Sequence, residues 1–322
     1  MSDERVIAID LGGTKLLTGV VGRDGIVVSR TVATSVTSDE DAAVGQIDAT
    51  IEEHHEEGII GIGVGVPSLV DQTTGRAVSS VNVPIQDFDL RDHLRERFDL
   101  PAGVDNDANC AALAEHTFGA GRGTRHMIML TLGTGVGGGL VLNGELYRGA
   151  YGAAAELGHM TIDLDGPPCQ GTCPGIGHLE VFASGNAAGD LARRVAGERP
   201  DGDLGRAAAA GQEVDAKLAV ELARGGPGDA RDVIDRIGRN LGVGIANYVN
   251  VFNPELVVLG GGFSRAAELL VEPALEVVRA RALAPSRDTV RIALAVLGVE
   301  AGLIGAGLVG FEAADAADAP GA

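Results

Sequence analysis

One aspartate in this sequence occupies a position suited to a catalytic base. Asp107 stands in the segment VDNDANCAALAE, where a short apolar strand over 102–104 gives way to an expected helix over 108–115. A carboxylate at such a strand end can face a cleft and accept the proton of an alcohol during phosphoryl transfer. The same position also suits an ordinary helix N-cap, for which Asp105 is an equal candidate. The local pattern leaves both interpretations open.

Three glycine-rich turns follow apolar strands and could cradle phosphate groups. Backbone N–H groups that are free of Cβ crowding can approach phosphate oxygens, and threonine hydroxyls or a lysine can add donors. Each turn alone could be an ordinary tight turn, but the three together favour a nucleotide clamp. The turns comprise Gly12, Gly13 and Thr14 followed by Lys15, then Gly133, Thr134 and Gly135, and finally Gly260, Gly261 and Gly262.

Two common nucleotide motifs are excluded by the residues around these glycines. The stretch 133–138 satisfies G-x-G-x-x-G, but the dinucleotide fingerprint must open a helix. Here a strand over 140–142 and the hairpin signal Asn143-Gly144 come next instead. Lys15 lacks the G-x-x-x-x-G-K-[ST] spacing that a P-loop requires.

The loop from Glu156 to Glu180 offers four metal ligands. Two imidazoles and two thiols are separated by gaps of nine, three and four residues, which allow a tetrahedral Zn²⁺ site. The alternative is a reduced cysteine pair without metal, but a loop this rich in proline and glycine has few other means of becoming ordered. The four residues are His159, Cys169, Cys173 and His178.

The composition restricts the class of protein. The chain has 322 residues, 45% apolar residues and a formal net charge of -20. That charge argues against a nucleic-acid partner, which requires basic patches. No apolar run approaches the length of a membrane span and no signal peptide is visible, so we expect a cytoplasmic protein. The three cysteines are too few for a disulfide scaffold, and Cys110 is read as a core residue.

The order of expected elements indicates an internal duplication. The chain opens with strands over 6–10, 16–21 and 26–28, and IDLGGTKLLTGVV resembles LTLGTGVGGGLVL near its middle, each being strand, glycine-rich turn and strand. Helices are expected over 39–57, 91–98 and 230–250, and strands over 59–66 and 256–259. The last ten or so residues are expected to fray.

Together these motifs resemble the ROK family (repressor, open reading frame, kinase) of sugar kinases and repressors. The N-terminal DLGGTK, DNDAN, LGTGVGGG, E-x-G-H and the cysteine loop occur in family order across nearly the whole chain. The resemblance implies an α/β fold of the actin-like ATPase (ribonuclease H-like, duplicated) type, with two domains and a cleft between them. We expect a small domain over 1–120 with a C-terminal return at about 300–322, and a large domain over 121–300 that carries the zinc loop 156–180.

The resemblance also implies a glucokinase-like activity, the ATP-dependent phosphorylation of the 6-hydroxyl of glucose. Asp107 would be the catalytic base, and Asp10 would orient Mg²⁺ through water. The glycine turns with Lys15 would hold ATP, with the third turn near the adenosine, while zinc would order the sugar site without doing chemistry. The sugar hydroxyls would be bound by Asn106, Glu156, His159 and Glu180, with Asn82 as a weaker candidate.

One departure from the family pattern concerns the metal ligands. Family members of this kind usually supply one histidine and three cysteines with a C-x-C pair. In this chain three residues separate Cys169 from Cys173, and His178 stands where a third cysteine is expected. A Cys2His2 set still satisfies zinc.

Several rival functions stay open at this stage. The substrate could be mannose, fructose or an N-acetylhexosamine, and the donor could be polyphosphate. A catalytically silent sugar sensor is disfavoured by the retained Asp107 and phosphate turns. A sugar-responsive repressor is disfavoured by the charge and by the start of the kinase-like body near Arg5, which leaves no room for a helix-turn-helix. By family resemblance we expect a homo-oligomer, dimer or tetramer.

Overall fold

The computed structural model describes residues 4–35, 39–80, 83–171 and 173–319. The chain forms two compact units, and the first contains Met1–Arg125, Gly139–Ala155 and Val296–Ala322. The second contains His126–Gly138 and Glu156–Ala295. The small domain expected over 1–120 with about 300–322, and the large domain expected over 121–300, stay predictions.

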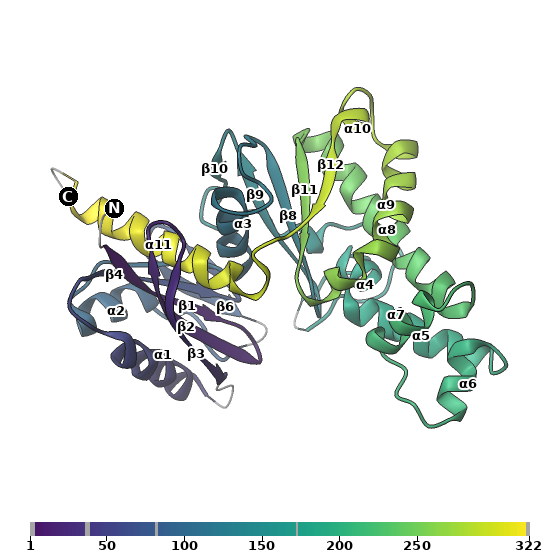
Figure 1. The fold of residues 1–322 in the computed structure, drawn as a ribbon, viewed down its shortest axis with the longest axis horizontal. Helices are drawn as coiled ribbons and strands as arrows, with labels where there is room; N and C mark the ends of the chain where they lie inside the picture. Colours follow the sequence, from purple (N-terminus) through teal and green to yellow (C-terminus); the bar gives the residue numbers. More distant parts are fainter. Residues whose placement is uncertain (1–3, 36–38, 81–82, 172, 320–322) are drawn as a thin grey trace. The chain divides into compact units, whose positions relative to one another are not determined.

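The first unit is built on a five-stranded sheet in the order β3-β2-β1-β4-β7 (Figure 1). The strands β1, β2 and β3 pair antiparallel as a meander, whereas β1, β4 and β7 are parallel. Their bounds are Arg5–Leu11 (β1), Lys15–Gly22 (β2), Val27–Thr34 (β3), Ile59–Val66 (β4) and Ala102–Asn106 (β7). A separate two-stranded ribbon comprises Ser68–Asp71 (β5) and Arg76–Ser80 (β6).

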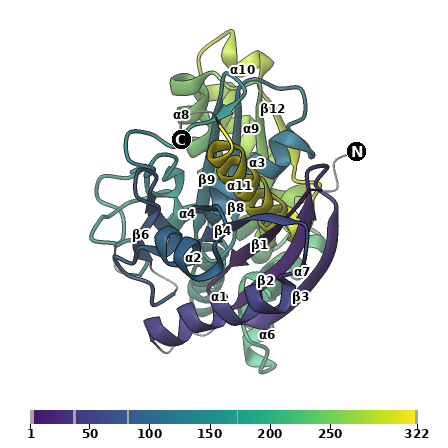
Figure 2. The ribbon, with the colours of Figure 1, turned by 90° about the vertical axis from the view of Figure 1, so that its left-hand side faces the viewer.

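Helices cover both faces of this sheet, which explains why β1 reads as an unbroken apolar run. Ile7 and Ile9 belong to a core cluster with α1 and α2, whereas Val6 and Ala8 belong to a cluster with α11. Figures 1 and 2 show α11 on one face of the sheet and α1 and α2 on the other. The helices of this unit are Glu40–His54 (α1), Leu90–Phe98 (α2), Asp107–Thr117 (α3) and Ala301–Ala317 (α11), with a short 3-10 turn at Gly298–Glu300 (η3).

A second five-stranded sheet repeats this order as β10-β9-β8-β11-β12. Its strands are Met127–Leu132 (β8), Val136–Leu142 (β9), Glu145–Leu146 (β10), Leu256–Gly260 (β11) and Arg291–Leu294 (β12). As in the first sheet, a hairpin is followed by parallel neighbours, here β8, β11 and β12. The two sheets therefore confirm the duplication that the twin hairpin sequences predicted.

The second unit also holds most of the helices. The long helix α8 is amphipathic and buries Val233, Ile237, Leu241 and Ile245, as its spacing predicted. The helices are Glu180–Ala183 (α4), Gly185–Glu198 (α5), Asp203–Ala209 (α6), Ala216–Arg224 (α7), Asp229–Phe252 (α8), Ala267–Arg281 (α9) and Ser286–Thr289 (α10), with 3-10 turns at Leu157–His159 (η1) and Gly262–Ala266 (η2).

The expected strands and helices are confirmed, with differences at their ends. Asp39 caps α1 by accepting a hydrogen bond from the Ala42 amide, as expected. The strand predicted over 26–28 spans Val27–Thr34, and the one expected over 140–142 begins at Val136, because both pair within hairpins.

The expectation of a frayed C-terminus is wrong for the residues up to Ala317. Helix α11 continues to Ala317, with Phe311 and Ala314 buried against the first unit. Arg23 holds this end through a bidentate contact with Asp315 and stacks 4.6 Å from the centre of the Phe311 ring. Tertiary packing thus orders a segment whose composition resembles a loose tail.

Among the described residues, no helix combines the length and the apolar character needed to cross a bilayer.

Close backbone contact between α11 and β4 yields the first prediction. A Cβ atom on Gly63 would lie 1.8 Å from the carbonyl oxygen of Ala306, which is backbone and cannot swing away. We expect Gly63→Ala to lower the free energy of unfolding by about 1–3 kcal/mol, measured by urea denaturation. Gly45→Ala is the control, because Gly45 is exposed on α1 with nothing near its Cβ position. That change should stabilise slightly; equal effects of the two substitutions would contradict the packing argument.

Candidate active site and metal centre

Strand register brings the acidic residues of the first unit to one edge of its sheet. Asp10 on β1 pairs with Gly65 on β4, and Gly65 pairs with Asp105 on β7. All three strands run in the same direction, so their carboxyl ends lie together. Asp107 follows two residues after Asp105, at the first position of α3. The two aspartates assigned from sequence to metal and to base therefore belong to the same sheet edge.

The N-cap of α3 is Asn106, so neither Asp105 nor Asp107 fills the capping role that the sequence left open as an alternative. The Asn106 side-chain oxygen accepts hydrogen bonds from the amides of Ala108 at 2.9 Å and Asn109 at 3.2 Å. Its amide nitrogen donates to the Ser68 carbonyl at 3.3 Å. Asp107 is half-buried, and its Oδ1 accepts from the Ala108 amide at 2.9 Å. Asparagine therefore makes the cap, and Asp107 is the first residue of α3.

The first glycine turn joins β1 to β2 beside this edge. The Gly12 amide donates to the Lys15 carbonyl at 2.8 Å, and the Ser35 hydroxyl donates to the Gly12 carbonyl at 2.6 Å. Thr14 and Lys15 are exposed, as a phosphate-binding turn requires.

Asp10 lies where a cation would be favourable. A Cβ atom at Gly302 of α11 would come within 2.3 Å of the Asp10 carboxylate, so the helix packs directly on this side chain. Burial raises the pKa of Asp10 to about 6. A positive ion nearby would offset that cost, so the residue fits the expected role toward Mg²⁺.

In the second unit, the E-x-G-H segment is held in a strained, tightly packed conformation. Ala155, just before Glu156, adopts a left-handed φ of 65°. Gly158 has no room for a side chain, since its Cβ would lie 2.0 Å from the Val136 carbonyl oxygen. Such strain is common at functional sites. It fixes the direction of Glu156 and of His159, which ends the 3-10 turn η1.

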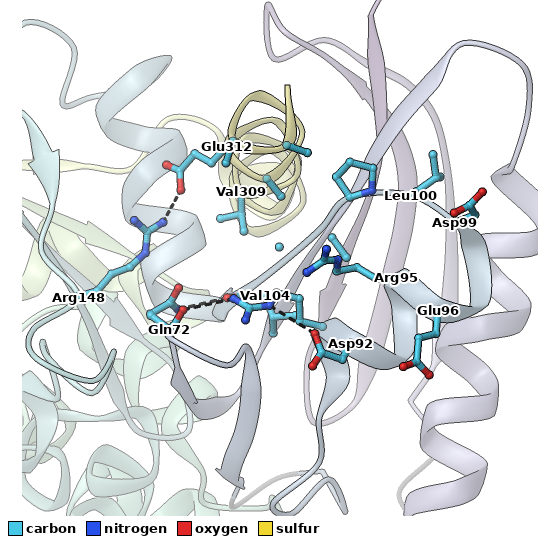
Figure 3. A pocket seen from close by; sticks show the side chains of 17 residues that line it. Gln72, Asp92, Arg95, Glu96, Asp99, Leu100, Val104, Arg148, Val309 and Glu312 are labelled. Atoms are coloured by element: carbon cyan, nitrogen blue, oxygen red, sulfur yellow. Dashed lines mark hydrogen bonds and ion pairs between the residues drawn. The ribbon is translucent and has the colours of Figure 1, made fainter. Parts of the chain in front are cut away.

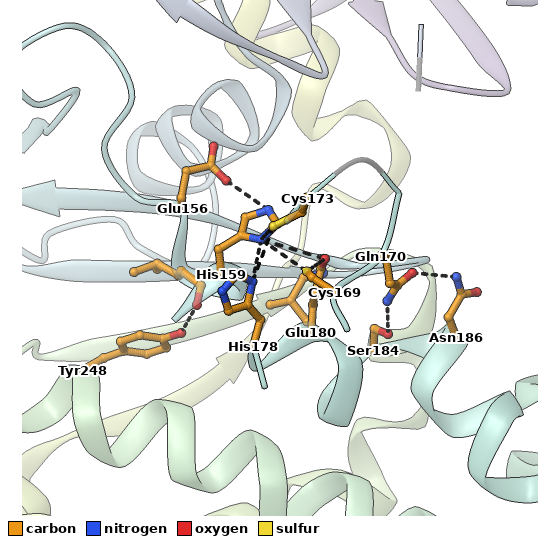
Figure 4. A network of polar contacts seen from close by, with 12 residues as sticks. Glu156, His159, Cys169, Gln170, Cys173, His178, Glu180, Ser184, Asn186 and Tyr248 are labelled. Carbon is orange, nitrogen blue, oxygen red and sulfur yellow. Dashed lines mark hydrogen bonds and ion pairs between the residues drawn. The ribbon is translucent and has the colours of Figure 1, made fainter. Parts of the chain in front are cut away.

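All four predicted metal ligands converge (Figure 4). One ligand atom from each of the four residues lies within 4.8 Å of the others. The His159 and His178 Nδ1 atoms are 3.2 Å apart, and the His159 Nδ1 atom is 3.6 Å from Cys169 Sγ and 3.7 Å from Cys173 Sγ. Cys173 Sγ is 3.7 Å from the His178 Nδ1 atom.

These separations suit tetrahedral zinc. Zn–N bonds of about 2.0 Å and Zn–S bonds of about 2.3 Å place neighbouring ligand atoms ~3.3–3.8 Å apart. The cluster would use Nδ1 of both histidines, while the His159 Nε2 atom lies 3.7 Å from a Glu156 oxygen. A carboxylate next to the second ring nitrogen orients a metal-bound histidine. His178 therefore occupies the place of a metal ligand, as the sequence suggested.

Backbone contacts also order the metal loop, more than its composition implied. The Cys169 amide donates to the Gly175 carbonyl, and Thr161 bridges to His178. Gly177 adopts φ of 67°, and a Cβ there would lie 1.6 Å from the Asp163 carbonyl. Backbone contacts therefore order this loop even without a metal, which the composition did not predict. The geometry of the four ligands also fits zinc.

Glu180 joins the metal cluster to the second glycine turn. Its Oε1 accepts from the Cys169 thiol at 3.0 Å, and its Oε2 accepts from the Val136 amide at 3.3 Å. Burial and the carboxylate of Glu180 raise the pKa of Cys169 to about 12. A bound cation would oppose this shift by favouring the thiolate.

Gln170, inside the metal loop, contacts the start of α5. Its Nε2 donates to the Ser184 hydroxyl at 3.2 Å, and its Oε1 accepts from the Asn186 amide at 2.8 Å. Ser184 is fully buried and caps α5 through the Ala187 amide. The metal loop is thereby tied to the start of a helix that also lines a pocket of this unit (Figure 4).

That pocket, of about 860 Å³, lies within the second unit beside the second and third glycine turns. Gly133 and Thr134 line it, as does Gly262, where a parallel strand end meets η2. Gly260 and Gly261 are not among the lining residues; a Cβ at Gly261 would lie 2.4 Å from the Leu132 carbonyl, so this glycine permits the close approach of two strand ends. The pocket has the size of a small-molecule site.

Sequence patterns missed several residues of this pocket. Helix α5 contributes Asn186 from its first turn and Arg193 from farther along, and the start of α7 contributes Lys217. These lie on helices separated along the chain, and no local motif marks them. Asn82, the weaker sugar-ligand candidate, lies outside the described residues.

Comparison with known proteins identifies the family. A glucokinase of Halalkalibacterium halodurans is 36% identical over 315 residues, 95% of each chain. The ROK family glucokinase of Streptomyces griseus, solved with glucose and AMPPNP, has a TM-score of 0.80 and 32% identity, covering 96% of this chain and 99% of that one. A putative xylose repressor of a Caldicellulosiruptor species is 33% identical over 310 residues, 93% of this chain and 76% of the repressor. The ROK family profile matches residues 6–310.

The chain belongs to the ROK family. Its fold is the α/β actin-like ATPase fold of ROK glucokinases, with two domains, as the sequence resemblance implied. ROK relatives comprise both kinases and repressors. The family alone does not determine which activity this member has.

The metal cluster of this ROK protein yields the second prediction. We expect Cys173→Ser to lower the zinc content of the purified protein from about one ion per chain to a small fraction, because one thiolate of four ligands is lost. Elemental analysis measures the outcome. Cys110→Ala is the matched control, since Cys110 is the third cysteine and lies buried in a core cluster. Zinc content that stays unchanged in Cys173→Ser would contradict the site.

The buried carboxylate of Asp10 yields the third prediction. Its folded pKa of about 6 exceeds the ordinary value of 3.8, so ionisation destabilises the fold as the pH rises through this range. We expect Asp10→Asn to raise the melting temperature at pH 8, and less so at pH 4, where the wild-type side chain is mostly protonated. Thermal melts in buffer without magnesium and without nucleotide test this. A gain that is the same at both pH values, or a loss at pH 8, would contradict it.

Proposed function

We propose that this ROK protein is an ATP-dependent kinase that phosphorylates the 6-hydroxyl of glucose. The observation that carries the proposal is the row of Asp10, Gly65 and Asp105 across three parallel strands, which brings Asp10 and Asp107 to one sheet edge. A kinase needs a carboxylate for the acceptor hydroxyl and a second one toward a cation at the phosphates. The S. griseus relative, solved with glucose and AMPPNP, supports the substrate pair.

Asp107 is the proposed base. Its carboxylate accepts the proton of the sugar 6-hydroxyl as that oxygen attacks the γ-phosphorus and ADP leaves. The half-buried position of Asp107 at the start of α3, on the sheet edge that also carries Asp10, supports this role.

The glycine turns are the proposed phosphate ligands. Backbone amides of the first turn, with Thr14 and Lys15, would contact phosphate oxygens, and Gly133, Thr134 and Gly135 would do the same from the second unit. Adenosine would occupy the pocket beside Gly133 and Gly262. Mg²⁺, held near Asp10 through water, would neutralise phosphate charge.

The proposed sugar ligands are Asn106, Glu156, His159 and Glu180, each of which can hydrogen-bond a hydroxyl group. Zinc would fix the ring of His159 through Nδ1 and leave Nε2 to a sugar hydroxyl or Glu156. The metal would thus order the sugar site without entering the chemistry.

The first test is a coupled assay for ADP release with Mg-ATP and a panel of glucose, mannose, fructose, N-acetylglucosamine and N-acetylmannosamine. We expect the highest kcat/KM with glucose. A higher value with another sugar would replace glucose in the proposal. Silence with every sugar, with ATP and then with polyphosphate as donor, would contradict the kinase function and favour a sugar sensor.

Replacement of the base provides the fourth prediction. We expect Asp107→Asn to lower kcat by about 10²–10⁴-fold, since general-base catalysis contributes that much, while glucose affinity measured by calorimetry changes little. Asp41→Asn is the control, because Asp41 is an exposed acid in the first turn of α1. Turnover of Asp107→Asn near the wild-type rate would remove Asp107 from the base position.

A further inference from the structure

We propose that Arg148 is a positioning residue for Asp107, acting through the buried carboxylate of Asp105. The proposal rests on the kinase function proposed for this chain. All the residues that carry it lie in the first unit. None of the sequence motifs includes Arg148, which stands after β10 in the segment leading to Glu156.

The carboxylate of Asp105 is completely buried and makes three hydrogen bonds. Its Oδ2 accepts from the Arg148 Nε at 2.5 Å. Its Oδ1 accepts from the Asn106 amide at 2.7 Å and from the Asn109 side chain at 2.9 Å. A buried charge of this kind needs an opposite charge and complete hydrogen bonding, and Arg148 supplies the charge.

Both donors to Asp105 Oδ1 belong to the turn that presents the base. Asn106 precedes Asp107 and caps α3, and Asn109 follows it on the first helical turn. Asp105 therefore binds the backbone amide of Asn106, just before Asp107, and the side chain of Asn109, two residues after it. Without its arginine, the Asp105 carboxylate would be drawn toward water or another donor, and the turn would move with it.

Arg148 is itself held in place by helix α11. Its NH2 group donates to the Glu312 carboxylate at 2.8 Å (Figure 3). Burial lowers the pKa of Arg148, but the charges of Asp105 and Glu312 outweigh this and raise it overall. The Arg148 guanidinium thus stays charged. Its ion pairs connect the segment after β10 to Asp105 on β7 and to Glu312 on α11.

One side of Arg148 faces an open pocket, which makes a chemical test feasible. The pocket is lined by Arg148, Glu312, Gln72 and Val104 (Figure 3), and it has a volume of about 860 Å³. Removal of the Arg148 side chain would leave a guanidinium-sized space that solvent can enter. An added guanidinium ion can then occupy the same place beside Asp105.

The fifth prediction compares Arg148→Ala, Arg148→Lys and the control Arg23→Ala. Arg23 also pairs with a carboxylate of α11, that of Asp315. Its hydrogen bonds to described residues go to Glu4 and Asp315, and none goes to Asp105. We expect Arg148→Ala to lower kcat by about 10–100-fold, since a small misplacement of a catalytic group costs that much, with the KM for ATP within about twofold. Arg148→Lys should retain part of the activity, and Arg23→Ala should retain all of it.

Guanidinium chloride, far below denaturing concentration, should restore part of the Arg148→Ala rate, whereas equal sodium chloride should not. A kcat of Arg148→Ala equal to wild type, or an equal loss in Arg23→Ala, would overturn the proposal. So would restoration by both salts, or by neither.

Hydrogen exchange separates this proposal from the kinase assignment. Amide exchange of a peptide spanning 104–113, followed by mass spectrometry, should be faster in Arg148→Ala than in wild type and unchanged in Arg23→Ala. A wild-type protein without kinase activity but with this pattern would reject the function and keep the structural role. Unchanged exchange in Arg148→Ala would reject the positioning role even in an active kinase.

Discussion

Parallel strands hold their carboxyl ends at one edge of a sheet, and this constraint acts on β1, β4 and β7. Register fixes Asp10, Gly65 and Asp105 in one row, and the chain leaves that row through the turn that carries Asp107. Gly65 lets β4 and α3 approach closely, since a Cβ atom there would make a tight contact of 3.1 Å with the Cys110 sulfur. The position of the proposed base therefore depends on backbone pairing before it depends on any side chain.

The same constraint operates in the second unit with different residues. There β8 and β11 are parallel neighbours with Thr131 paired to Gly260, so the turns that follow them lie together. Thr131 stands on β8 where Asp10 stands on β1, Gly260 stands on β11 where Gly65 stands on β4, and this edge serves a pocket. A duplicated topology with different residues at equivalent edges allows one unit to supply acids and the other to supply a nucleotide pocket, which is the division of roles in our proposal.

An ion held by His159, Cys169, Cys173 and His178 would stabilise a loop that other contacts only partly order. Its four ligands connect to Glu180, and Glu180 connects to the second glycine turn at Val136. Gln170 connects the same loop to the start of α5. Metal binding would thus affect the proposed sugar ligands and the proposed nucleotide pocket through short chains of contacts. The exchange of a cysteine for His178 keeps this arrangement, since an imidazole nitrogen and a thiolate can both complete a tetrahedral set.

The sequence by itself determined the features that depend on neighbouring residues. Alternation of strand and glycine turn predicted both hairpins, the DNDAN segment predicted a strand that passes into a helix, and ligand types predicted the metal cluster.

The tertiary structure alone decided what depends on distant segments. Asp105 and Arg148 are 43 residues apart, and Arg148 and Glu312 are 164 apart, so no local pattern could reveal their ion pairs. Likewise, α11 extends to Ala317 because of Arg23 and the core, and Lys217 enters a pocket only because α7 packs beside the glycine turns. Short motifs predict the residues that can do chemistry, whereas burial and long-range charge pairing exist only once the chain has folded.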